Sequence, residues 1–143
     1  MNSSFDYKQL VETSADAVMV CDADGKITLW NAASERMFGF SSAEALGQSL
    51  DIIIPQRQQA RHWEGYHVTM ATGVTKYGAS VLRVPAVHKD GHTLSIAFTV
   101  SLMRDSNKKI TGIVAIVRDE SVKFAEERAL RKRILDLEQE LKK

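Results

Sequence analysis

This 143-residue sequence contains very little cysteine, few aromatic residues and almost no net charge. Cys21 is the only cysteine, which excludes an intrachain disulfide and a cysteine-rich zinc site. The 19 basic and 18 acidic residues give a net charge of +1, which argues against a nucleic-acid-binding surface. Aromatic residues make up 7 % of the chain, so an aromatic platform for stacking bases is not indicated either.

The sequence also lacks long hydrophobic runs. None approaches the roughly 20 apolar residues that a membrane-spanning helix needs, and the first dozen residues lack the apolar core of a signal peptide. Hydrophobic residues nevertheless account for 44 % of the chain, enough to build a core. The length suits one domain with a short additional element. We therefore expect a cytoplasmic protein, or the cytoplasmic part of a longer one, with no membrane span and no nucleic-acid partner.

The first third of the chain predicts a short helix and then two strands around a tight turn. Residues 5–12 (FDYKQLVE) have an amphipathic pattern, and AVMVCDADGKITLWN contains two β-rich runs separated by Asp24 and Gly25. This pair favours the positive φ angles of a two-residue hairpin loop. Asn31 then suits the N-cap of a short helix that ends at Gly39.

Two further helices are predicted next. Ser41 and Glu44 have the spacing of a capping box, and Pro55 fits the first turn of a longer helix, PQRQQARHWEGYHVTMATG. This longer helix contains His62 and, three residues later, Gly65, which costs about 1 kcal/mol relative to alanine. The glycine leaves space beside the imidazole for a flat cofactor. Ordinary packing of a partly buried histidine, with the glycine allowing close contact with a sheet, is the alternative.

The second half of the chain predicts three antiparallel strands. The runs KDG (89–91) and DSNK (105–108) supply the two turns, and Pro85 indicates an edge strand or a bulge. His88 and His92 flank the first turn and are expected to be exposed. Apolar residues alternate along the second of these strands: Leu94, Ile96, Phe98, Val100 and Leu102. With the first pair of strands this predicts an α+β fold that contains a five-stranded sheet.

Residues 122–143 predict a charged helix beyond the domain. Its apolar residues are spaced by four, three and four, as in a coiled coil: Leu130, Ile134, Leu137 and Leu141. We interpret this helix as a connector that pairs in a homodimer and leads to a downstream output domain. An amphipathic helix folded back on the domain is the alternative.

Most of the chain, residues 5–121, resembles the PAS family. The similarity runs through DGKI, the pair WN and FGFSSAEALG, and then through KDGHTLSIAFTVSLMRD and ITGIVAIVRDES. The resemblance implies a PAS sensor domain over residues 1–121, with a five-stranded antiparallel sheet and with short helices and one longer helix on one face. It also implies a C-terminal signalling helix over residues 122–143. PAS domains are sensory or dimerisation modules, and many pass signals to a histidine kinase or a cyclase.

Within this family, the long helix is similar to that of the haem-binding branch, the FixL-like oxygen sensors and the direct oxygen sensor phosphodiesterases. The resemblance implies haem b, with His62 as the iron ligand. Leu82 stands where FixL-like sensors have an oxygen-stabilising arginine, and Ser80 stands where the phosphodiesterases have a methionine ligand. We therefore expect a dry pocket for a diatomic gas, O2, CO or NO. The other residues expected near the cofactor are Gly65, Tyr66, Lys76, Tyr77, Ser80, Leu82, Phe98 and Val100.

The main alternative is a PAS relay module that binds flavin, a small organic ligand or no cofactor. Ser80, Thr99 or Asn31 could contact an organic ligand. Covalent flavin photochemistry is not expected, because the segment GQSLDIIIPQR lacks the reactive cysteine of that branch and Cys21 lies on the first strand. An enzyme is not expected either, since the acidic residues lie at turns, where they favour the local backbone conformation.

Overall fold

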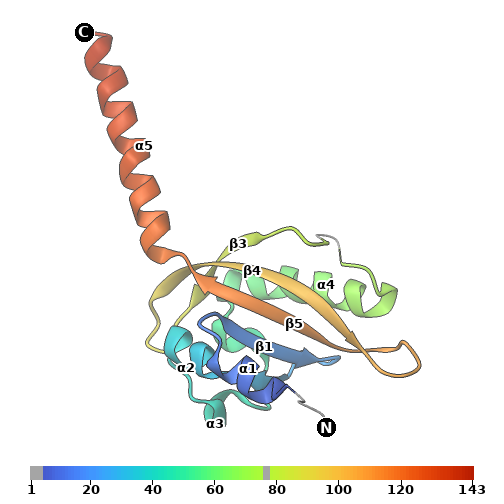
Figure 1. Cartoon of the computed structure of the whole chain (residues 1–143). Helices are drawn as coiled ribbons and strands as arrows, with labels where there is room; N and C mark the ends of the chain where they lie inside the picture. Colours follow the sequence, from blue (N-terminus) through green and yellow to red (C-terminus); the bar gives the residue numbers. More distant parts are fainter. Residues whose placement is uncertain (1–4, 76–77) are drawn as a thin grey trace.

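The computed structural model describes residues 5–75 and 78–143 (Figure 1). Lys76 and Tyr77, both expected near a cofactor, lie outside the described residues. In chain order the elements are α1 (Tyr7–Thr13), β1 (Ala17–Asp22), β2 (Ile27–Trp30), α2 (Ala32–Phe38), α3 (Ser42–Ala45), the 3-10 helix η1 (Leu50–Ile53), α4 (Gln56–Thr72), β3 (Leu82–Val87), β4 (Thr93–Arg104), β5 (Ile110–Asp119) and α5 (Ser121–Leu141).

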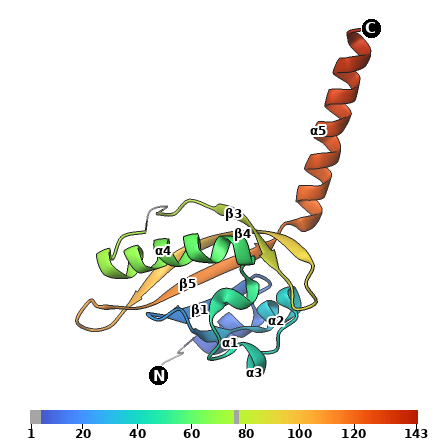
Figure 2. The ribbon, with the colours of Figure 1, turned by 180° about the vertical axis from the view of Figure 1, so that it is seen from behind.

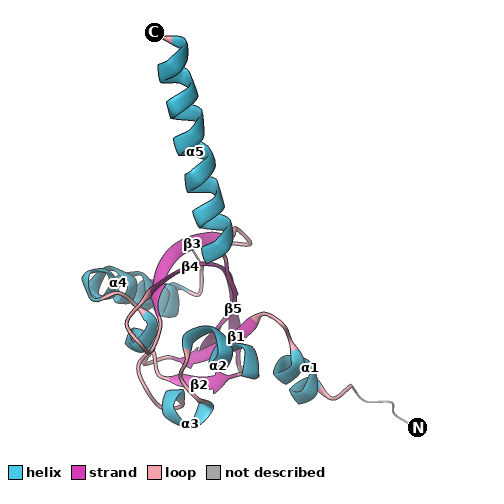
Figure 3. Cartoon of the chain, turned by 90° about the vertical axis from the view of Figure 1, so that its left-hand side faces the viewer, coloured by secondary structure: helices cyan, strands magenta, loops and turns pink. Residues whose placement is uncertain are grey.

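The sheet is antiparallel, with the strand order β2-β1-β5-β4-β3. The β1–β2 hairpin joins the β3–β4–β5 unit where β1 pairs with β5, Ala17 lying opposite Val117. The helix α4 lies on one side of the sheet and α1 on the other (Figure 3). The predicted five-stranded α+β fold is confirmed. Pro85 lies in the edge strand β3, as expected for a residue that has no backbone N–H to donate to a second neighbour.

Alternate residues of the strands pack into one hydrophobic core. In β4 the predicted alternation is confirmed at Leu94 and Ile96, which are buried together with Phe38 of α2 and Met19 of β1. Burial of each large apolar side chain contributes roughly 1.5–3 kcal/mol. Because α2 and α3 are short, this packing rather than intrinsic helix propensity stabilises them.

The ends of the short helices follow the predicted capping residues. Asn31 caps α2 by accepting a hydrogen bond from the backbone N–H of Ser34, and Gly39 ends this helix with a φ of +83°. Ser41 and Glu44 form both hydrogen bonds of a capping box at the start of α3. These capping residues fix where α2 and α3 begin and pair backbone N–H groups that the first turn of a helix leaves free.

The Asn31 side chain does more than cap a helix, because it connects three segments in the interior. It is 1 % exposed. Its Oδ1 accepts hydrogen bonds from the Val18 N–H (2.9 Å), the Ser34 N–H (3.0 Å) and the Ser34 hydroxyl (2.9 Å). Its Nδ2 donates to the carbonyl oxygens of Val11 (2.8 Å) and Asp16 (3.2 Å). The hypothesis that Asn31 contacts an organic ligand is therefore wrong, since these buried contacts occupy the whole amide.

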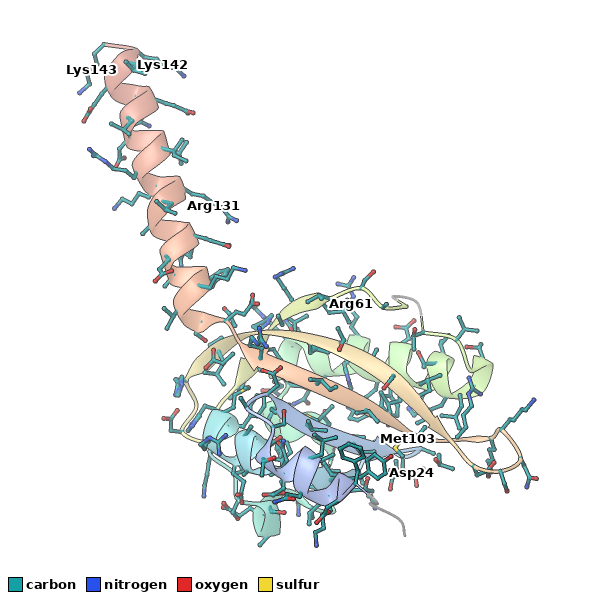
Figure 4. The ribbon with its side chains drawn as sticks, in the orientation of Figure 1. Asp24, Arg61, Met103, Arg131, Lys142 and Lys143 are labelled. Atoms are coloured by element: carbon teal, nitrogen blue, oxygen red, sulfur yellow. The ribbon has the colours of Figure 1, made fainter. Side chains whose placement is uncertain are left out.

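The helix α5 leaves the end of the sheet and extends away from the domain, with Arg131 projecting from its side (Figure 4). None of its residues is buried. It is therefore not folded back on the domain. The four predicted coiled-coil residues are exposed: Leu130 by 63 %, Ile134 by 54 %, Leu137 by 41 % and Leu141 by 87 %. Within the described part of the chain, no helix has both the length and the hydrophobicity to cross a membrane.

Replacing Asn31 with alanine should destabilise the domain strongly. We expect Asn31→Ala to lower the free energy of unfolding by about 3 kcal/mol, because the change removes a helix cap and leaves buried backbone groups unpaired. Urea denaturation measures this difference. Asn107→Ala, in the exposed β4–β5 turn, is the matched control and should change stability by less than about 0.5 kcal/mol. Equal unfolding midpoints for the two variants would contradict the assigned role of Asn31.

Candidate functional site

Two aromatic residues fasten α4 to the β1–β2 hairpin. Tyr66 is the buried residue of α4, and its hydroxyl donates a hydrogen bond to the carbonyl oxygen of Asp22. Burial raises the pKa of this hydroxyl, so it remains a donor. The Trp63 indole N–H donates to Asp51 Oδ1 at 2.6 Å. The indole ring lies against Gly25, where an added Cβ would come within 2.2 Å of it. These contacts hold the middle of α4, which runs across one face of the sheet (Figure 2).

His62 lies beside these anchors, with an imidazole nitrogen that has no partner. Its ring centroid is 4.5 Å from that of Trp63 and 5.9 Å from that of Tyr66. Its Nδ1 is buried, and none of the described residues forms a hydrogen bond with it. Burial lowers the pKa of the imidazole, and the charge of Asp51 opposes this shift. Because nearly all buried polar atoms in folded proteins have a partner, a neutral imidazole with an unpaired nitrogen is a candidate ligand-binding group.

The inner face of the sheet presents an apolar surface toward α4. Leu82 of β3 lies opposite Phe98 of β4, and Val100 follows on the same face. These three residues are only half-buried, whereas Leu94 and Ile96 on the same face of β4 are buried. The structure thus places the three apolar residues expected at the cofactor on one surface, and α4 covers that surface incompletely.

The neighbouring polar residues of β3 and β4 point to the outer face. Arg83 is exposed, and its Nε lies 3.4 Å from Glu120 Oε2. Thr99 lies opposite Ile116, which is exposed on that outer face. The hypothesis that Thr99 contacts a ligand between α4 and the sheet is therefore wrong. Alternation along a strand explains both orientations, because successive side chains point to opposite faces.

Exposure or burial argues against a role for three other residues considered from the sequence. Ser80 is exposed and precedes β3. Gly65 is also exposed, and an added Cβ there would meet no atom within 4 Å. The interpretation of Gly65 as a close contact with the sheet is wrong. Cys21 is buried on β1, and burial raises the pKa of its thiol to about 12, so the thiol stays protonated.

Sequence reasoning did not identify Asp51 and Trp63 as part of this region. Trp63 adjoins His62, and the run of aromatic and imidazole side chains in HWEGYH was an available signal. Asp51 lies in η1, twelve residues before its hydrogen-bond partner Trp63. Nothing in that spacing predicts the contact, because it depends on how η1 and α4 meet in space.

This sheet order, with short helices and one long helix on its inner face, defines a known class of α+β sensory folds. A family model described as the PAS fold matches residues 6–119. The chain therefore belongs to the PAS family, as its motifs predict.

Three relatives match most of this chain. An uncharacterized protein of Azorhizobium caulinodans is 32 % identical over 86 % of this chain and 17 % of its own length. The sensor protein FixL of Bradyrhizobium diazoefficiens is 28 % identical over 94 % of this chain and 25 % of its own. The oxygen sensor protein DosP of Escherichia coli is 24 % identical over 90 % and 16 %. This chain spans a quarter or less of the length of these curated relatives.

Solved structures show the same fold. The PAS domain of a protein from Colwellia psychrerythraea is similar with a TM-score of 0.70 and 23 % identity, over 80 % of this chain and 94 % of that one. An RNA-binding light-oxygen-voltage receptor also has a TM-score of 0.70, with 16 % identity over 90 % of this chain and 36 % of that one. At these identities the likeness concerns the fold alone.

The buried imidazole should be visible in a pH titration of the protein without added cofactor. We expect His62 to titrate below the ordinary value of about 6.5, because burial disfavours the charged ring. The unfolded chain then takes up the proton first, so the free energy of unfolding should decrease as the pH falls below about 6.5. Histidine NMR signals and denaturation at several pH values measure both effects.

Two variants isolate the contribution of this residue. His62→Gln should lose this part of the pH dependence, whereas His67→Gln, at an exposed histidine of the same helix, should retain it. An imidazole of His62 that titrates at or above the ordinary value would refute the assignment.

Proposed function

We propose that this chain is the haem-binding sensory part of a bacterial-type signalling protein. Residues 1–121 would form the sensor, and residues 122–143 the helix that passes its state onward. The observation that carries the proposal is the buried Nδ1 of His62, which no described residue pairs, on a neutral imidazole next to an incompletely covered apolar surface. The sensor proteins among the relatives support the sensory role.

The residues present fit haem b. An iron-binding histidine must be neutral, and burial favours the neutral form of His62. Leu82, Phe98 and Val100 would exclude water from the same space. The Tyr66 hydroxyl holds α4 in place and is already paired with the backbone of Asp22. When bound, haem supplies an iron that coordinates a diatomic gas or changes oxidation state.

The apolar surface also bears on which gas would be sensed. Leu82 offers no hydrogen bond, and the guanidinium of Arg83 pairs with Glu120 on the outer face. A gas held here would lack a positively charged donor from β3. This environment suits CO or NO better than O2, which acquires more negative charge on binding and gains more from such a donor.

The alternative is a PAS module that uses a small organic ligand, flavin or no cofactor. One observation favours it: Trp63 and Tyr66 pack around His62, as they would around an ordinary partly buried histidine. The light-oxygen-voltage receptor shows that this fold is not restricted to one class of sensor. Flavin, if bound, would be held without a bond to Cys21, whose thiol is buried and protonated.

Reconstitution with hemin distinguishes the two proposals. We expect the wild-type protein to take up one haem per chain and to show a sharp Soret band, because His62 supplies the iron ligand. His62→Ala should lose or displace that band. His67→Ala removes the exposed histidine five positions later on the same helix and should leave the spectrum unchanged.

Two results would argue against haem. A wild-type protein without stoichiometric hemin uptake would make His62 a structural residue and favour the alternative. A His62→Ala spectrum identical to that of the wild type would place any bound haem elsewhere.

The proposed signal would leave the sensor through the junction of β4, β5 and α5. The Glu120 N–H donates to the Ser95 carbonyl oxygen at 2.8 Å, and the Ser95 N–H donates to Ser121 Oγ at 3.0 Å. A change in β4 therefore reaches the first turn of α5 directly. In our proposal α5 pairs in a cytoplasmic homodimer and shifts the population of states of an output domain such as a histidine kinase or cyclase. The chain itself would catalyse no reaction.

The proposed pairing of α5 can be tested with two Leu→Glu changes only two positions apart. Leu137→Glu places a charge at a coiled-coil core position and should weaken self-association at least about tenfold, or ~1.4 kcal/mol. Leu135→Glu changes another exposed leucine of α5, 57 % exposed but outside the heptad pattern, and should have little effect. Sedimentation equilibrium measures both, and a monomeric wild type or equal weakening by both changes would contradict this mode of pairing.

A further inference from the structure

The turn between β3 and β4 brings two imidazoles to one carboxylate. In the run HKDGH, ligand atoms of His88, Asp90 and His92 all lie within 4.8 Å of one another. The His88 Nδ1 is 3.3 Å from Asp90 Oδ1, and the His92 Nδ1 contacts the same oxygen. The two rings stack with their centroids 4.5 Å apart. The expectation that both histidines are exposed is wrong for His88, whose side chain is 22 % exposed.

The fold holds this turn in position. The His88 N–H donates to the His92 carbonyl oxygen at 2.9 Å, and the Lys89 N–H donates to the carbonyl oxygen of Phe38, also at 2.9 Å. The second bond docks the turn on the end of α2. The His88 ring packs against Gly39, where an added Cβ would lie 2.5 Å from it. These contacts hold the turn and the His88 ring in position without a bound ion.

We propose that this turn binds a divalent transition-metal ion, with His88, Asp90 and His92 as ligands and water at the remaining position. Two imidazoles with one carboxylate suit Zn2+, Ni2+ or Cu2+ better than the oxygen-preferring Mg2+ or Ca2+. Tetrahedral bonds of about 2.0–2.1 Å place neighbouring ligand atoms roughly 3.3 Å apart. The His88 Nδ1 and Asp90 Oδ1 already have this separation.

Ion binding requires two local exchanges: the His92 Nδ1 and Asp90 Oδ1 give up their hydrogen bond to each other, and the His88 Nδ1 gives up a backbone N–H. The His88 Nδ1 accepts the Asp90 N–H at 3.1 Å, an exposed contact, so water can take over the N–H when the nitrogen binds an ion. The charge of Asp90 offsets part of that of the cation. The site is independent of His62 and of haem.

The position of the turn suggests what the ion would do. His92 precedes β4 and lies three residues before Ser95, whose backbone N–H and carbonyl oxygen hold the start of α5. An ion that ties His92 to His88 would restrain this end of β4. The conformation of the domain near the start of α5 would then depend on the concentration of free transition-metal ions.

Calorimetric titration of Zn2+ into the haem-free protein without an affinity tag tests the site. We expect one ion per chain and a melting temperature that rises with Zn2+ concentration. Asp90→Asn keeps a side-chain oxygen for the His92 N–H, which Asp90 Oδ1 accepts at 2.9 Å, but removes the anionic ligand. His92→Ala removes one imidazole. Each change should weaken Zn2+ binding by at least about 10- to 100-fold and reduce the thermal shift at a given Zn2+ concentration.

Changes at the two histidines of α4 serve as controls. His67→Ala and His62→Ala should bind Zn2+ with wild-type affinity, which also separates this site from the proposed haem site. Absence of saturable binding in the wild type would overturn the proposal. It would equally be overturned by wild-type affinity in both Asp90→Asn and His92→Ala, or by loss of binding in either control.

Discussion

The arrangement of this domain depends on the burial of one amide, that of Asn31. A buried amide without partners is costly, so α1, β1 and α2 must all present the correct backbone group to it. The hydrogen bonds to Val18 and Ser34 set the angle at which α2 leaves the sheet, and the bond to Val11 holds the end of α1. This placement of α2 puts the Phe38 side chain in the core. The Phe38 carbonyl oxygen then accepts a hydrogen bond from the Lys89 N–H of the β3–β4 turn.

The longest helix of the domain is held differently. α4 buries Tyr66 alone; Tyr66 and Trp63 attach it to the β1–β2 hairpin and to η1, and at its C-terminal end Arg104 of β4 donates a hydrogen bond to the Gly73 carbonyl oxygen at 2.9 Å. Between these attachments α4 buries little of its surface. A helix that buries a single side chain over a half-buried apolar surface is suited to admit a ligand, and the unpaired nitrogen of His62 lies on that helix. This division between a rigid hairpin and a less tightly held helix makes a sensory role physically reasonable.

Hydrogen bonds from β4, rather than ion pairs, connect the sheet to the outgoing helix. The ion pair at the base of α5 joins Arg83 to Glu120 at 3.4 Å, and exposed ion pairs of this kind contribute only about 0–1 kcal/mol. Ser95 bonds to the start of α5 through its carbonyl oxygen and through its N–H, and the N–H bond to the Ser121 hydroxyl is partly buried and so less open to competition from water. The strand β4 thus connects the inner apolar surface at Phe98, the HKDGH turn and the base of α5. A ligand that shifts β4 would therefore alter the hydrogen bonds between Ser95 and the first turn of α5.

Local features of the sequence determined most of the fold. The alternation around Leu94 and Ile96, the cap at Asn31, the glycine at Gly39 and the proline of β3 act over a few residues, so their spacing reveals strands, helix ends and the sheet edge. The resemblance to the haem-binding branch of the family likewise pointed to His62 as the candidate iron ligand. Only the tertiary structure decided that its Nδ1 lacks a partner, that Asp51 reaches Trp63, that Ser80 is exposed and that His88 is packed against the end of α2. Such contacts join residues far apart in the chain, and their geometry depends on how whole elements pack, which no local spacing specifies.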